Sequence, residues 1–295
     1  MSIPTSLGHK IRLLLCGPIA AIRAEAGGCI NSAVSLDSGG NRYFLKWNDA
    51  APEGLFRAEV DGLRLLKEAG TLAVPEVVAF DEGTESSPAF LLLHHFGNAR
   101  RRADFFETLG RGLAALHRNS GQAYGHGSDN FIGTLDQRNT WAASWPEFFA
   151  ERRLLAQARL GEQSDAVGSE RIGSECIRAV ERLCAKLGGI LPSAPETSLL
   201  HGDLWSGNVA ADSTGSPVIY DPAVYFGHRE VELAFTELFG GFSDRFYAAY
   251  NASWPLEPGY AERRDVYNLY PILVHANLFG GSYEGQALSI LRRFV

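Results

Sequence analysis

The sequence predicts an α+β protein with two lobes, a small lobe built on an antiparallel sheet and a larger, mainly helical lobe. Two observations support this prediction. The first part of the chain alternates between strand-like and helical patterns, whereas long amphipathic helices dominate from residue 98 onward. At 295 residues and 32.1 kDa, the chain is also long enough to bury a large core, as one domain or as two lobes that share a cleft.

The small lobe is expected to cover residues 1–93. Turn-forming residues divide its strand-like segments at 37–41 and 81–88. The elements that we expect are a strand over 42–47, a helix over 52–70 and a strand over 89–93. Pro52 opens this helix and Gly70 closes it, which is the usual asymmetry of helix ends.

A hinge over 94–97 and a second lobe over 98–295 are expected to follow. The first helix of the second lobe is predicted over 104–117, where apolar residues recur at helical spacing. The residues that share its apolar face are Phe105, Leu109, Leu113 and Leu116. The stretch 161–168 consists mostly of small and polar residues and is expected to be a loop.

The composition fits a compact protein that does not act on nucleic acid. Apolar residues make up 45% of the chain, charged residues 21%, and the formal net charge is −7. Binding to the phosphate backbone of nucleic acids draws on clustered Lys and Arg, so nucleic acid is not an expected partner. An acidic surface suits a cationic or amine-bearing molecule better.

The cysteines and apolar runs predict a reducing, cytoplasmic location. The four cysteines lack the paired CxxC spacing of structural zinc sites, and Cys176 and Cys184 are expected to share one helix as small core residues. The run 13–22 resembles a short secretory signal, but Gly17 and Pro18 interrupt it. No run reaches the roughly 18 apolar residues of a membrane span, so no membrane association is expected.

A buried ion pair is predicted between the strand 42–47 and the helix 52–70. Glu59 falls within the arc of the helix that carries its apolar residues. Because burial of an unpaired charge is costly, a cation should meet this carboxylate. Lys46 is the only charged residue in the strand core 43–47. The alternative is that Glu59 is exposed and Lys46 lies on an edge strand.

A glycine-containing turn precedes this strand. Gly27, Gly28, Cys29 and Asn31 lie between two predicted strands, where glycine allows backbone N–H groups to approach a phosphate. The GxGxxG spacing is absent, so a simple hairpin connection is the alternative. Cys29 would be exposed there, as a redox-sensitive thiol or as an inert small residue. We therefore expect a monomer and leave open a dimer linked through Cys29 under oxidation.

The segment 201–208, HGDLWSGN, carries residues that a phosphoryl-transfer site needs. It lies between apolar stretches, so a tight loop should present Asp203 and Asn208 together. Asp221 follows at the end of a short apolar strand over 217–220. Attack on a nucleoside triphosphate requires oxygen ligands for a divalent ion and a carboxylate near the acceptor hydroxyl. The alternative is a capped turn in which these side chains satisfy backbone donors.

Several neighbouring residues have two possible roles. Trp205 could stack on the sugar end of an acceptor or serve as a packing residue, and His201 is expected to brace the loop. Residues that could line an acceptor pocket, but for which bracing is favoured, are Asn130, Gln137, Asn139 and Trp145. The cluster 228–230 is expected to form a helix cap and a salt bridge. The histidines interpreted as ordinary helix or loop residues are His9, His117, His126 and His275.

Residues 201–208 resemble the catalytic loop of the aminoglycoside phosphotransferase-like kinases, and the resemblance extends from about residue 27 to residue 280. Longer segments resemble the fructosamine (ketosamine) 3-kinases in particular. These segments are YGHGSDNFIGTLDQRNTWAASW at 124–145, DPAVYFGHREVELAFTELFGG at 221–241 and YNLYPILVHANLFG at 267–280. The resemblance implies a two-lobed protein-kinase-like fold.

The resemblance also implies the activity. Members of this family use ATP and Mg²⁺ to phosphorylate the 3-hydroxyl of ketosamines, which are sugars attached to amines by glycation. The expected partners are therefore glycated amines, either small molecules or lysines of glycated proteins. The 3-phosphate product readily eliminates and frees the amine, so the resemblance implies deglycation and protein repair.

By the same resemblance, Asp203 would orient the sugar 3-hydroxyl and accept its proton, with Trp205 beside the substrate. Asn208 and Asp221 would bind Mg²⁺. Lys46 and Glu59 would hold the ATP phosphates, under a cover formed by Gly27, Gly28, Cys29 and Asn31. The hinge residues His94, His95 and Phe96 would contact adenine through the backbone, although many relatives carry an acidic residue where this chain has histidines.

Two other functions are alternatives to a ketosamine kinase. The first is a kinase for another hydroxylated amine, such as an aminoglycoside or choline, against which the segment 130–145 and Trp205 argue. The second is a nucleotide-binding pseudokinase that acts as an interaction module. The presence of all five polar residues argues against it: Lys46, Glu59, Asp203, Asn208 and Asp221.

Overall fold

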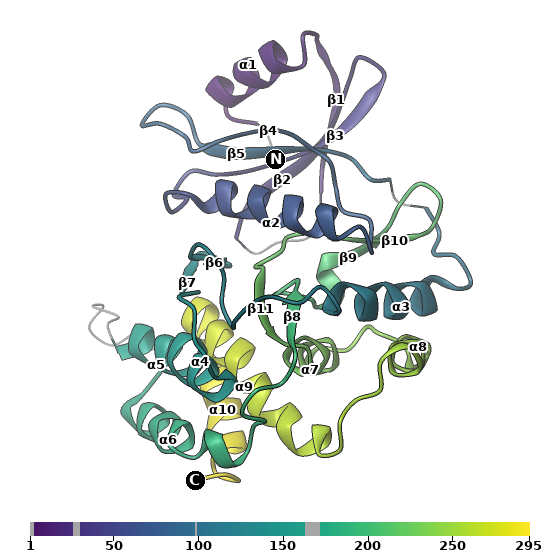
Figure 1. The fold of residues 1–295 in the computed structure, drawn as a ribbon. Coiled ribbons are helices and arrows are strands. Elements are labelled where there is room, and N and C mark those ends of the chain that lie inside the picture. The colour runs from purple at the N-terminus through teal and green to yellow at the C-terminus, as the bar shows by residue number, and fades with distance from the viewer. Residues whose placement is uncertain (1–2, 26–29, 98, 163–171) are drawn as a thin grey trace.

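A five-stranded antiparallel sheet lies at one end of the molecule and a group of helices at the other (Figure 1). The computed structural model describes residues 3–25, 30–97, 99–162 and 172–295. This arrangement confirms the predicted α+β class. Most of the loop expected over 161–168 lies outside the described residues, and the boundaries of the proposed hinge stay a prediction.

The sheet has the strand order β1-β2-β3-β5-β4, and each neighbouring pair is antiparallel. Its strands are β1 (Ile19–Ala24), β2 (Ser32–Ser38), β3 (Asn41–Asn48), β4 (Val77–Asp81) and β5 (Ala89–His94). β3 and β5 confirm the strands predicted over 42–47 and 89–93. Because β3 is the central strand, the alternative that placed Lys46 on an edge strand is wrong.

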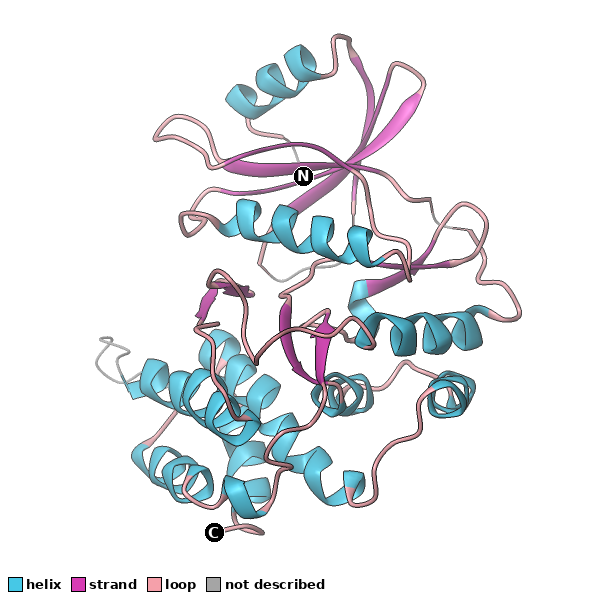
Figure 2. Ribbon diagram, in the orientation of Figure 1, coloured by secondary structure: helices cyan, strands magenta, loops and turns pink. Residues whose placement is uncertain are grey.

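One helix covers each face of this sheet (Figure 2). α1 (Thr5–Leu14) buries Leu7 and Ile11 against Phe90 and Leu92 of β5. The alternate residues of β5 face the other helix, since successive side chains of a strand point to opposite faces. Sequence analysis did not predict α1, and the run 13–22 that resembled a secretory signal forms its end and the start of β1.

α2 (Leu55–Ala69) is the helix predicted over 52–70 and begins three residues later than expected. Gly54 precedes it with a φ of 83°, and Gly70 ends it with a φ of 64°. Both angles lie in the left-handed region that glycine adopts without strain. The apolar arc is buried: Phe56, Val60 and Leu63 pack against β5, whereas Leu66 packs in the cluster that contains α3.

The second part contains the remaining helices and three short strand pairs. The helices are α3 (Phe105–His117), α4 (Trp145–Phe148), α5 (Leu155–Glu162), α6 (Ser174–Cys184), α7 (Glu230–Leu238), α8 (Asp244–Ser253), α9 (Tyr260–Phe279) and α10 (Tyr283–Leu291). A π-helical turn over Phe149–Leu154 joins α4 to α5. α3 confirms the helix predicted over 104–117, with Asp104 at its N-cap.

The short strands determine where the polar loops lie. The antiparallel pairs are β6 (Asn130–Ile132) with β7 (Leu135–Gln137), β8 (Thr197–Leu200) with β11 (Tyr225–His228), and β9 (Val209–Ala211) with β10 (Pro217–Ile219). His201 follows β8 directly, and Asp221 comes two residues after β10. Backbone hydrogen bonds from Ala223 to His201 (2.8 Å) and from Tyr220 to Asn208 (3.2 Å) hold the two loops side by side.

The three described cysteines are free thiols. Cys176 and Cys184 share α6, as predicted, and Cys176 is fully buried whereas Cys184 is partly buried. Burial raises the pKa of each of these two thiols to about 12. Within the described ranges, no helix has both the length and the apolar composition that crossing a bilayer requires.

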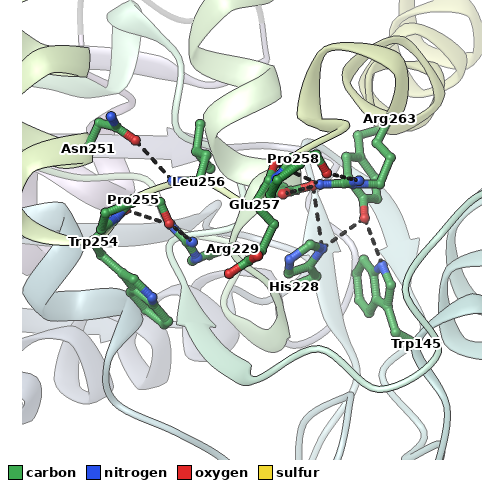
Figure 3. A network of polar contacts seen from close by, with 12 residues as sticks. Trp145, His228, Arg229, Asn251, Trp254, Pro255, Leu256, Glu257, Pro258 and Arg263 are labelled. Carbon is green, nitrogen blue, oxygen red and sulfur yellow. Dashed lines mark hydrogen bonds and ion pairs between the residues drawn. The ribbon is translucent and has the colours of Figure 1, made fainter.

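A polar network at the start of α7 fastens this helix to α9 and to the segment between α8 and α9 (Figure 3). Arg263 of α9 makes a two-pronged ion pair with the buried Glu230, at 2.7 and 2.6 Å. Arg229 donates to the carbonyl oxygens of Trp254 (3.0 Å) and Pro255 (2.5 Å). The predicted salt bridge is thus present, but the predicted side-chain cap is not, since Arg229 at the N-cap makes no capping hydrogen bond.

Removal of Arg263 should destabilise the fold. Arg263→Ala leaves the carboxylate of Glu230 buried without its cation, so we expect the free energy of unfolding to fall by about 3 kcal/mol or more. Urea denaturation measures this change. Arg292→Ala is the control, because Arg292 and Glu175 lie 3.4 Å apart with side chains that are 70% and 66% exposed; its cost should stay below about 1 kcal/mol. Equal losses in both variants would contradict the prediction.

Candidate active site

One lysine joins the sheet, α2 and the helical part. Lys46 Nζ lies 2.6 Å from Glu59 Oε2 and 2.7 Å from Asp221 Oδ1, and its side chain is only 4% exposed. Burial lowers the pKa of Lys46, but the charges of Asp221 and Glu59 outweigh this effect and raise the pKa above its ordinary value. The lysine therefore stays charged. The ion pair predicted between Lys46 and Glu59 is present, and the alternative of an exposed Glu59 is wrong, since that side chain is 12% exposed.

His201 braces the loop 201–208 from inside. Its Nε2 donates to the carbonyl oxygen of Tyr220 at 3.0 Å, and its Nδ1 accepts the backbone N–H of Asp203 at 3.3 Å. Burial lowers the pKa of His201, so the ring stays neutral and keeps one donor and one acceptor. This confirms the predicted bracing role, because both ring nitrogens are already used by the backbone.

A buried carboxylate beneath the loop holds its backbone. Glu232 of α7 accepts the N–H of His201 at 3.1 Å and the N–H of Gly202 at 2.7 Å. His117 of α3, which sequence analysis interpreted as an ordinary helix residue, is fully buried and lies 2.9 Å from the same carboxylate. Although burial raises the pKa of Glu232, the hydrogen bond and charge of His117 lower it below its ordinary value. Glu232 thus remains an anion.

Sequence reasoning missed Glu232. Its only signal was its place in a mostly apolar stretch of α7, where a carboxylate needs partners. Gly202 is required at the same point, since its φ is +85° and an added Cβ would lie 1.9 Å from the carbonyl oxygen of Ala223. The conformation of Gly202 therefore fixes the direction in which the backbone continues into Asp203.

Asp203, Asn208 and Asp221 meet at one cleft. Asn208 Nδ2 donates to Asp203 at both its backbone oxygen (2.8 Å) and Oδ2 (2.9 Å). Burial and then the nearby charge of Asp221 raise the pKa of Asp203 to about 8. Asp221 has a φ of 58°, which is uncommon outside glycine and is typical of residues held in place at functional sites.

The donor atoms around this cleft fit a magnesium ion that also binds nucleotide phosphates. Mg²⁺ in phosphoryl-transfer enzymes is held by one or two protein side chains, with the remaining ligands from phosphate and water. Asn208 uses its Nδ2 toward Asp203, which leaves Oδ1 as a hard oxygen donor, and Asp221 lines the same cleft. No cluster of three or more His, Cys, Asp or Glu side chains suited to a metal occurs in the described part of the chain.

The cleft has a volume of about 530 Å³ and lies between the sheet and the helices. It is lined by Asn31, Lys46 and Glu59 from the first part and by Asp203, Trp205, Asn208 and Asp221 from the second. Trp205 is 40% exposed and its ring meets that of Phe239 at 6.5 Å, so it packs at the surface of the cleft and not in the core, and its stacking on the acceptor stays a prediction. Gly27, Gly28 and Cys29 lie outside the described residues, and their proposed contact with the nucleotide stays a prediction.

The residues for which bracing was favoured do brace the second part. Gln137 and Asn139 donate to Asn130 Oδ1, each at 2.8 Å, and Asn130 Nδ2 donates to the carbonyl oxygen of Val224, also at 2.8 Å. Trp145 is fully buried. Asn130 alone of these four also lines the cleft.

The hinge residues are held by bonds within the protein. β5 extends to His94, the N–H of His95 donates to the carbonyl oxygen of Arg42 (3.1 Å), and the carbonyl oxygen of Phe96 accepts from Ser213 (2.9 Å). These are backbone groups through which adenine contacts were expected. A role of His94, His95 and Phe96 in nucleotide binding therefore stays a prediction.

A small antiparallel sheet with an interior Lys–Glu pair, facing a loop that carries Asp203 and Asn208, defines a kinase of the protein-kinase-like fold. The chain belongs to the fructosamine kinase family, whose model matches residues 17–295.

Individual proteins agree with this assignment. The chain is 42% identical to a Synechocystis protein named "Probable ketoamine kinase", over 92% of this chain and 89% of that protein. It is 36% identical to the chloroplastic protein-ribulosamine 3-kinase of rice (subspecies japonica), over 94% of this chain and 79% of that protein. A crystal structure from Thermobifida fusca, provisionally named a fructosamine-3-kinase, superposes with a TM-score of 0.84 at 31% identity and covers 97% of each chain.

The raised pKa of Asp203 predicts how stability depends on pH. The folded-state pKa of about 8 exceeds the ordinary 3.8, so the stability that Asp203 contributes is present below pH 4 and is lost as the pH rises through 8. Asp203→Asn removes this loss. Without nucleotide or metal, the stability of the variant relative to the wild type should therefore rise by about 2 kcal/mol or more between pH 4 and pH 8. Urea denaturation at several pH values tests this, and parallel curves for the two proteins would contradict it.

Proposed function

We propose that this protein is an ATP-dependent kinase that phosphorylates the 3-hydroxyl of ketosamines and so starts their removal from amines. The observation that carries the proposal is the convergence of Asp203, Asn208 and Asp221 on one cleft, in a chain of the fructosamine kinase family. The names of its relatives, ketoamine kinase and protein-ribulosamine 3-kinase, support the class of acceptor. The expected substrates are glycated amines, on small molecules or on protein lysines.

Asp203 acts on the acceptor. Its carboxylate accepts the proton of the 3-hydroxyl as that oxygen attacks the γ-phosphorus of ATP. The bond between the γ-phosphorus and the bridging oxygen then breaks, and ADP leaves with that oxygen. A pKa near 8 suits this role, because a general base works best when its pKa is close to the working pH.

The remaining polar residues act on the nucleotide. Lys46, held by Glu59, would contact the phosphates, which is how a strand lysine and a helix glutamate act in protein kinases. Asn208 and Asp221 would hold Mg²⁺, which supplies neutralisation of the phosphate charge when bound. Catalysis then rests on positioning and on charge stabilisation rather than on a covalent intermediate.

The two competing functions are less well supported. A pseudokinase would not need Lys46, Glu59 and Asp203 in the arrangement described above. A kinase for an aminoglycoside or choline stays the alternative among enzymes, and comparison of these acceptors in one ADP-release assay separates it from the proposed activity.

We further propose that the protein works as a monomer in the cytoplasm. The absence of a disulfide among the three described cysteines is compatible with a reducing compartment. A dimer linked through Cys29 under oxidation stays open, and a non-reducing gel of oxidised protein tests it.

Asp203→Asn should abolish most of the activity and leave the fold intact. The amide cannot accept the hydroxyl proton, so we expect kcat with a ketosamine to fall by about 100- to 1000-fold or more. A coupled ADP-release assay on fructosyl- and ribulosyl-lysine measures this, and circular dichroism checks the fold. Asp136→Asn is the matched control, since Asp136 is 63% exposed and lies outside the cleft. Near-normal turnover of the Asp203 variant would remove this residue from its role.

Lys46→Met should weaken the use of ATP. The variant loses the cation that would meet the phosphates, so kcat/KM for ATP should fall by about 100-fold or more, in line with the loss of a preorganised charge contact. Lys67→Met, which removes an exposed lysine from the same helix that carries Glu59, should leave kcat/KM unchanged. If both variants use ATP equally well, the phosphate-holding role of Lys46 is wrong.

A further inference from the structure

One side of the cleft is a group of aromatic rings for which the proposed chemistry gives no role beyond Trp205. We call this group the aromatic wall, and its members are Trp205, Phe239, His275, Phe279 and Tyr283, which all line the cleft. They come from the loop 201–208, the end of α7, α9 and the start of α10. Sequence analysis read His275 as an ordinary helix residue, and that interpretation is incomplete because its ring lines the cleft.

The aromatic wall exposes an unusual amount of apolar surface. Among the described residues, eight large hydrophobic side chains are exposed, and three of them belong to the wall: Trp205 (40%), Phe239 (40%) and Phe279 (48%). Single exposed apolar residues are common, but a group of them in one cleft marks a surface that binds something. The continuity of this surface with Asp203 indicates that its ligand is part of the acceptor.

The rings hold one another in place around His275. Its ring centroid lies 4.9 Å from that of Phe239, 5.6 Å from that of Phe279 and 5.1 Å from that of Tyr283. Trp205 meets Phe239 edge to face at 6.5 Å. Such ring pairs are favourable in themselves, so the wall is formed before any ligand arrives and costs little to organise on binding.

His275 adds a hydrogen-bond acceptor to this wall. Its Nδ1 lies 2.7 Å from the carbonyl oxygen of Pro271, and since a carbonyl oxygen only accepts, Nδ1 carries the proton. Burial lowers the pKa of His275, so the ring is neutral and Nε2 keeps its lone pair. An N–H group of a ligand in the cleft can donate to that lone pair.

One carboxyl group of the cleft is left to meet a cation. Glu59 and Asp221 are paired with Lys46, whereas Asp203, which also lines the cleft, makes no ion pair with another described residue. The faces of aromatic rings also attract cations, most strongly ammonium groups that are partly removed from water. An alkylammonium group carries the positive charge, the N–H donors and the carbon chain that match these three features.

We propose that the aromatic wall binds the protonated nitrogen of the ketosamine and the carbon chain attached to it, while Asp203 meets the sugar. This inference rests on the proposed function and deepens it: the amine, as well as the sugar, is recognised.

Binding measurements without turnover test the aromatic wall. Isothermal titration calorimetry with ADP and Mg²⁺ in place of ATP compares 1-deoxy-1-(hexylamino)fructose with its isostere in which CH₂ replaces the nitrogen. The wild type should bind the charged compound more tightly. Phe239→Leu and Phe279→Leu keep apolar surface but lose a ring face, so each should reduce this preference by roughly 2- to 30-fold. His275→Phe keeps a ring but loses the acceptor, and should reduce the preference as well.

Trp141→Leu is the matched control, since Trp141 is 46% exposed but does not line the cleft, and it should leave both affinities unchanged. Equal binding of the two compounds by the wild type, or an unchanged preference in Phe239→Leu and Phe279→Leu with native circular dichroism, would overturn the inference. Failure of the proposed function has a different signature: the wild type would then transfer no phosphate from ATP to any ketosamine, whatever its binding preference.

Discussion

The ionic contact of Lys46 with Glu59 and Asp221 is the constraint on which the site depends. These three side chains come from the sheet, from α2 and from the helical part, so one buried cation fixes how the two parts face each other. Glu59 in particular needs this cation, because its side chain is only 12% exposed and a buried acid without a partner would be strongly destabilising. All three side chains line the cleft, so the contact that joins the two parts is also part of the site.

A second set of contacts decides where Asp203 stands. Glu232 ties the backbone of the loop to α7, and His117 ties Glu232 to α3, so the loop is anchored to two helices through buried charge. The same architecture buries Asp203 and places it near the charge of Asp221, and both effects raise the pKa of Asp203. The φ of Asp221 and the like charges of Asp203 and Asp221 destabilise the site, so it depends on stabilising contacts elsewhere in the helical part. The ion pair of Glu230 with Arg263 is one of these contacts.

Much of the fold and part of the site could be predicted because the signals were local. The helix α2 was readable from its apolar arc, and the single acid within that arc predicted the ion pair of Glu59 with Lys46. The helix α1 was missed because its last residues belong to the apolar run 13–22. Gly17 and Pro18 interrupt this run, which was compared with a signal sequence. Glu232 was missed because an acid in a helix does not reveal, by spacing alone, that its partners are backbone N–H groups thirty residues away in the chain.

The sequence by itself determined which segments form helices and strands, because hydrophobic periodicity depends only on neighbours along the chain. It also determined the polar groups that phosphoryl transfer needs, because the segment HGDLWSGN is a local motif. Only the tertiary structure decided which groups share a space. The aromatic wall shows this most clearly: Phe239, His275 and Tyr283 each have an ordinary helical or loop context, and they become one surface only when α7, α9 and α10 pack together. Such a surface depends on distances between segments, which no local pattern encodes.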